Sequence, residues 1–81
     1  MCMAGTPASN IPLGKALRQI RDREGLTQED LAFKAGLHST WISAVERGVR
    51  DPRWSTVCQM AKGLGVRPME LIALAERIEL D

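Results

Sequence analysis

A strip of short side chains that ends in a guanidinium is the part of this sequence best suited to recognition chemistry. Its members fall on one face of a helix expected between residues 39 and 47: Ser39, Thr40, Ser43, Ala44 and Arg47. Ile42 and Val45 would face a core on the other side. Short polar side chains can approach a surface closely, and the DNA major groove admits a helix and displays donors and acceptors on its base edges. Small polar residues are equally ordinary on a solvated helix, so this spacing alone leaves both interpretations open.

Three arginines surround the segment that follows this helix. Arg47, Arg50 and Arg53 flank Pro52, which cannot continue a helix and therefore predicts an extended loop. Guanidinium groups form paired hydrogen bonds with phosphate oxygens, so arginines at the end of a candidate recognition helix favour contacts to a nucleic-acid backbone. A solvated loop is the alternative interpretation. Lys34, which precedes the helix in the chain, is a further candidate for a phosphate contact.

The residue types needed for catalysis or metal binding are sparse. His38 is the single histidine, the two cysteines are Cys2 and Cys58, and no metal-ligand spacing connects them. The sequence also lacks paired carboxylates, a Ser/His/Asp set and a phosphate-cradling glycine loop, so we expect no enzyme, no cofactor and no metal. We expect Cys58 to be free and mostly buried, which suits a reducing cytosol.

Size and charge distribution narrow the class of protein. The chain of 81 residues suffices for one small domain, and such a domain is marginally stable alone and often gains stability by pairing. Residues 1–67 carry ten basic and six acidic side chains, a net +4, whereas residues 68–81 carry a net −3. This asymmetry is compatible with a nucleic-acid face in the body of the domain. No apolar run could cross a bilayer and no signal-peptide layout is present, so we expect a cytoplasmic protein with no membrane partner.

Hydrophobic periodicity predicts an all-α fold. Helices are expected over residues 13–24, from the Thr27 cap to Gly36, over residues 39–47, over residues 54–64 and over residues 68–79. Thr27 and Asp30 predict a carboxylate variant of the capping box, and Gly36 predicts a left-handed end to that helix. Residues 1–12 show no period and are expected to form a flexible tail, which leaves residues 13–81 as the domain.

The last expected helix carries more apolar side chains than one buried stripe can hold. They are Met69, Leu71, Ile72, Leu74, Ala75, Ile78 and Leu80. Some must face the core, and the remainder would be exposed on a monomer. We expect a self-association face that includes Ile72, Ile78 and Leu80, and a frayed end with scattered surface hydrophobics is the alternative.

The chain resembles the Cro/repressor-type helix-turn-helix family, the XRE-like DNA-binding domains. The segments that carry the resemblance are LTQEDLAFKAGLHSTWISAVERG, RDPRWSTVCQMAKGLGV and PMELI, and together they span about residues 13–75. The family's two diagnostic glycines correspond to Gly36 and Gly48. The resemblance implies a five-helix, lambda-repressor-like helix-turn-helix domain. In size the chain is similar to restriction-modification controller proteins.

The resemblance also implies roles for individual residues. The positions that face bases in the family, or lie beside those that do, are Ser39, Thr40, Ser43, Ala44 and Arg47. Gln28 matches the residue that clasps a phosphate at the start of the second helix, where the helix dipole is positive. Trp41 matches an aromatic residue that packs and touches the sugar-phosphate backbone. Arg47, Arg50, Arg53 and Lys34 would supply further phosphate contacts.

The resemblance gives one position a structural role, and at another the chain departs from the family pattern. Glu46 matches a carboxylate that pairs with an arginine of the first helix, here Arg21, and this pair would brace the scaffold. His38 stands at the cap of the recognition helix, where Ser, Thr or Asp is usual. Ala44 cannot hydrogen-bond a base, so its side chain would offer only contact with a thymine methyl.

The function that these expectations define is a homodimeric transcriptional regulator that binds an inverted-repeat operator in double-stranded DNA, as a repressor or autoregulatory controller. RNA polymerase is a second candidate partner, through the acidic residues Glu29 and Asp30. The alternative is an antitoxin or adaptor whose helix-turn-helix domain binds a partner protein.

Overall fold

The computed structural model describes residues 11–80 as five helices. Their bounds are α1 Ile11–Arg23, α2 Gln28–Ala35, α3 Ser39–Glu46, α4 Trp54–Leu64 and α5 Pro68–Leu80. These residues contain no strand, so the predicted all-α fold is confirmed. Residues 1–10 of the expected tail, and Asp81, lie outside the described part of the chain. None of the helices within residues 11–80 has the length and apolar character needed to span a membrane.

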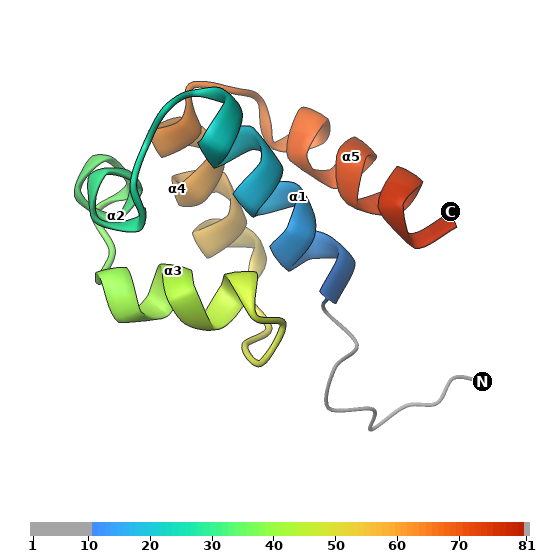
Figure 1. Ribbon diagram of the computed structural model, residues 1–81, viewed down its shortest axis with the longest axis horizontal. Coiled ribbons are helices and arrows are strands. Elements are labelled where there is room, and N and C mark those ends of the chain that lie inside the picture. The colour runs from blue at the N-terminus through green and yellow to red at the C-terminus, as the bar shows by residue number, and fades with distance from the viewer. Residues whose placement is uncertain (1–10, 81) are drawn as a thin grey trace.

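Helix α1 runs through the middle of the domain (Figure 1). It packs against α5 and against α3, while α2 packs against α3 and α4. The large side chains that are fully buried by this packing are Leu17, Leu31, Ile42, Val45, Met60 and Leu71. Because these residues come from all five helices, a single core fixes the position of each helix relative to the others.

Local sequence sets both ends of α2, as predicted. Thr27 Oγ1 accepts from the Asp30 backbone N–H, and the Asp30 carboxylate accepts from the Thr27 backbone N–H, each at 3.0 Å. This bond from the Thr27 backbone holds the pKa of the Asp30 carboxyl below its usual value. Gly36 has a φ of 73°, a left-handed conformation that glycine adopts without steric cost. The capping box and the glycine end are confirmed, and they fix the short turn into α3.

The contact between α1 and the end of α3 depends on a second glycine. A Cβ built on Gly14 would lie 2.6 Å from the carbonyl oxygen of Glu46 and 2.9 Å from its carbonyl carbon. Because these are backbone atoms, a side chain at this position would push α3 away from α1. Gly14 therefore sets how closely the C-terminal end of α3 approaches the scaffold.

The structure corrects two expectations about the helices. Helix α1 begins at Ile11, two residues before the predicted start, because Pro12 fits in the first turn, where its missing N–H removes no intrahelical bond. Cys58 is half-buried, not mostly buried. The buried side of α4 is formed by Val57, Met60 and Leu64, and Cys58 lies at the margin of that stripe.

Candidate nucleic-acid interface

The outward face of α3 carries most of the predicted strip. Thr40 and Arg47 are exposed, and Ser39 and Ser43 are half-buried. Ala44 departs from the expected outward position because only 9% of it is exposed. It lines a hollow that Thr40 of the strip also lines.

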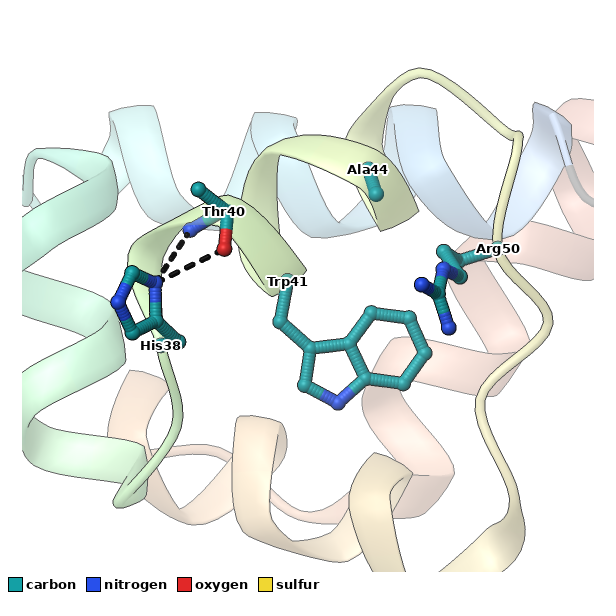
Figure 2. A pocket seen from close by; sticks show the side chains of 5 residues that line it. All are labelled: His38, Thr40, Trp41, Ala44 and Arg50. Carbon is teal, nitrogen blue, oxygen red and sulfur yellow. Dashed lines mark hydrogen bonds between the residues drawn. The ribbon is translucent and has the colours of Figure 1, made fainter.

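The side chain of His38 caps the first turn of α3. The His38 backbone is extended, and its Nδ1 accepts from the Thr40 backbone N–H at 3.3 Å. Thr40 Oγ1 lies 2.8 Å from the same nitrogen, as the dashed lines in Figure 2 show. His38 thus performs the capping role that a Ser, Thr or Asp usually performs. Sequence reasoning identified the unusual cap but missed its bond to the Thr40 side chain, which the two-residue spacing could have indicated.

A hollow of about 350 Å³ opens beside α3. The residues that line it are His38, Thr40, Trp41, Ala44 and Arg50 (Figure 2). The guanidinium carbon of Arg50 lies 5.0 Å from the centroid of the Trp41 ring, within the range of a cation–π contact. Trp41 itself is half-buried and packs against the hydrophobic core. It therefore holds a cation from the segment after α3 close to the outward face of the helix.

A carboxylate network ties the other side of α3 to α1 and α2. Arg21 donates from Nε to Glu46 Oε2 at 2.6 Å and from Nη2 to Glu46 Oε1 at 3.1 Å. Gln28 Nε2 donates to Glu46 Oε1 at 3.0 Å, and Arg21 also donates to the Leu26 carbonyl at 2.8 Å. The bond to Glu46 raises the pKa of the Arg21 guanidinium. Arg21 and Glu46 therefore form the ion pair that the family resemblance implies, and its place between three helices suits a bracing role.

The remaining candidate phosphate contacts are distributed around this site. Gln28 is half-buried, and one of its amide protons is used by Glu46, an interaction that the sequence did not indicate. Arg53 is exposed at the cap position of α4. Lys34 is exposed but lines a different hollow, together with Lys62 and Gly65, so the structure does not bring it to the hollow beside Trp41.

Residues 12–75 match the model of the helix-turn-helix domain family. The chain belongs to this family. Helices α2 and α3 form its helix-turn-helix unit, with Gly36 in the turn. The match places the protein among DNA-binding transcriptional regulators of the helix-turn-helix class, which are not enzymes.

The relatives of this helix-turn-helix protein include restriction-modification controllers. It is 42% identical over 60 residues to the control protein C.BamHI of Bacillus amyloliquefaciens, an alignment that covers 73% of this chain and 74% of that protein. The crystal structure of the controller protein C.AhdI from Aeromonas hydrophila is similar with a TM-score of 0.76 and 38% identity, over 79% of this chain and 97% of that one. The controller protein C.Esp1396I, solved as a tetramer in complex with its natural 35 base-pair operator, is similar with a TM-score of 0.81 and 31% identity, over 88% and 93% of the two chains.

Proposed function

We propose that the protein is a homodimeric transcription factor that binds an inverted-repeat operator, as a repressor or autoregulatory controller, with α3 in the major groove. The observation that carries this proposal is the two-sided construction of α3. One side presents the exposed Thr40 and Arg47, and the other is braced by the buried contact of Glu46 with Arg21. A helix held in this way is already ordered before binding, so it loses little conformational freedom when its short side chains contact base edges.

The cations near α3 support a backbone-binding role. Arg47 and Arg50 are exposed and follow α3 directly, and Arg53 lies a few residues further on. In the proposed complex these three residues, with Gln28 and Trp41, contact phosphates and set the register of the helix on the duplex. Lys34 lies beside Gly65 of the α4–α5 connection, away from α3, and is not assigned a contact. Ser39, Thr40 and Ser43 then contact base edges.

The exposed apolar side chains of α5 support pairing. Ile72 is 42% exposed, Met69 is 69% exposed and Leu80 is 80% exposed. Ile78 is half-buried and packs against the core of its own chain, so it offers less area to a partner than the other two candidates. Dimers that read inverted repeats place their recognition helices about 34 Å apart, one turn of the duplex. The C.Esp1396I controller forms a tetramer on its operator, and this assembly of several chains on one DNA agrees with the proposed arrangement.

Contact with RNA polymerase through α2 remains a prediction. Glu29 is exposed on that helix, while Asp30 already uses its carboxylate in the cap. Glu29 is thus the better candidate of the two for a contact with a partner protein.

The proposal is tested by selection from a random pool of duplex DNA, followed by titration of the selected duplex. We expect an inverted repeat, and we expect Arg47→Ala to weaken binding and lower the slope of log affinity against log salt by about one. Arg67→Ala is the matched control, because Arg67 lies in the connection between α4 and α5, which Figure 1 shows on the opposite side of the domain from α3. Equal affinity and salt slope for wild type and Arg47→Ala would contradict the assigned contact, and failure to select any sequence would contradict the function.

A further inference from the structure

The hydrogen bonds around His38 fix which way the Thr40 hydroxyl can point its proton. The Thr40 backbone N–H, 3.3 Å from His38 Nδ1, can only donate, so Nδ1 must be the acceptor and carries no proton. The ring proton of the neutral imidazole then lies on Nε2, on the far side of the ring in Figure 2. With the proton on Nε2, the Thr40 hydroxyl 2.8 Å from Nδ1 donates its own proton to the same lone pair, which the hydroxyl and the backbone N–H share in a three-centre bond.

The Thr40 hydroxyl is left with acceptor capacity only. Its single proton is directed at His38, while its side chain is exposed on the outward face of α3. A threonine without this partner can rotate its hydroxyl and either donate or accept, and so can bond to amino and keto groups alike. His38 removes that ambiguity, and it does so from within the protein before any ligand arrives.

We infer that Thr40 recognises the exocyclic amino group of a base, N6 of adenine or N4 of cytosine, and that His38 is the positioning residue that imposes this choice. The polar groups in the major groove are amino donors, on adenine N6 and cytosine N4, and acceptors, which are the keto oxygens and the N7 atoms of the purines. A hydroxyl that can only accept a hydrogen bond will pair with these amino donors, and it is repelled by thymine O4 and guanine O6. The inference rests on the proposed function, because it assigns the chemistry read by α3 within that function.

The position read by Thr40 is found first. Random duplex pools are selected with wild type and with Thr40→Val, which keeps the branched shape but has no hydroxyl. We expect the preference at one position of each half-site to relax in the variant while the other positions keep theirs. If no position relaxes, the inference is overturned although the proposed function stands. If wild type selects no sequence at all, the proposed function fails together with it.

The functional group is then identified with base analogues in the selected duplex. One duplex replaces the amino group at that position by hydrogen, with purine for adenine or the 4-unsubstituted pyrimidinone for cytosine. A second duplex removes the keto oxygen of the paired base in the same manner. Each analogue disturbs base pairing equally for wild type and Thr40→Val, so the ratio of their affinities isolates the contribution of the hydroxyl.

Removal of the amino group should lower wild-type affinity by about five- to tenfold more than it lowers the affinity of Thr40→Val, as expected for one hydrogen bond. Removal of the keto oxygen should change the affinities of wild type and Thr40→Val by the same factor. The reverse pattern, or an equal response of both proteins to both analogues, would overturn the inference.

Two substitutions of His38 separate positioning from simple capping. His38→Asn keeps an oxygen acceptor that can cap Thr40 and receive its hydroxyl proton, so discrimination between amino and keto groups should be retained. His38→Ala frees the hydroxyl, and the discrimination at the Thr40 position should fall to about twofold or less while an amino or keto base is accepted equally. If His38→Ala weakens binding but leaves the discrimination unchanged, His38 does not determine the polarity of Thr40.

Discussion

Replacing Glu46 by alanine should unfold the domain at a much lower temperature without removing a DNA-contacting side chain. The Glu46 side chain is 5% exposed and that of Arg21 is 11% exposed, so both charges are largely shielded from solvent. Removing one partner of a buried pair costs about 3–5 kcal/mol, whereas an exposed pair contributes about 0.2–1 kcal/mol. Arg21 would keep its bond to the Leu26 carbonyl and its proximity to Asp22 at 3.5 Å, so we expect the lower end of the buried range, about 3 kcal/mol.

The loss of stability in Glu46→Ala is measured by thermal and urea unfolding at one fixed protein concentration, because pairing makes the unfolding midpoint depend on concentration. For a domain of this size about 3 kcal/mol corresponds to a fall in Tm on the order of 15 °C. Glu29→Ala is the matched control, since it removes the same charge from an exposed position on α2. Glu46→Gln keeps one acceptor for Gln28, so it should lose less stability than Glu46→Ala. It also gives a measurable free energy of unfolding if the alanine variant does not fold.

A loss of stability in Glu46→Ala no larger than the loss in Glu29→Ala would contradict this prediction. A contribution of that size would mean that the Arg21–Glu46 pair behaves as an exposed pair. The bracing of α3 against α1 and α2 would then have to come from apolar packing alone.

Three further predictions concern packing, charge and assembly. Gly14→Ala should destabilise the fold by about 1–3 kcal/mol in urea unfolding, since the added methyl meets the backbone of Glu46, and a gain in stability would contradict the contact. Asp30 has a folded-state pKa below its unfolded value, so its stabilisation is present at neutral pH and is lost as pH falls through the folded-state pKa. The stability difference between wild type and Asp30→Asn should therefore shrink as the pH falls below the ordinary aspartate pKa of 3.8, and a difference independent of pH would contradict the capping role. Ile72→Asp should shift the species seen by sedimentation from dimer to monomer, and an unchanged dimer would remove α5 as the interface.

Much of the fold could be predicted because its signals are local. Thr27, Asp30 and Gly36 specify both ends of α2 through bonds between near neighbours, and the structure has these bonds. The spacing of Ile42 and Val45 predicts the buried side of α3, and both residues are fully buried. The predicted start of α1 is wrong by two residues because Pro12 is compatible both with a tail and with a first helical turn.

The parts that could not be predicted depend on neighbours distant in the sequence. Periodicity predicts which face of a helix a residue lies on, but not how deeply a residue at the edge of that face is buried. Ala44, predicted to face outward, is therefore only 9% exposed, and Cys58, predicted to be mostly buried, is half-buried. The Gln28 bond to Glu46 spans 18 positions and follows only from how α2 and α3 pack. The stacking of Arg50 over Trp41 likewise requires the path of the loop after α3, which no local pattern encodes.

The central claim is tested most directly by equilibrium binding of the wild-type chain to two duplexes of equal length and composition. One carries the sequence obtained by selection, and the other carries the same bases in shuffled order. At physiological salt the account predicts an affinity ratio of at least about 10³ in favour of the selected duplex. A ratio near one would contradict it, because α3 would then contribute charge to the complex but no recognition of base edges.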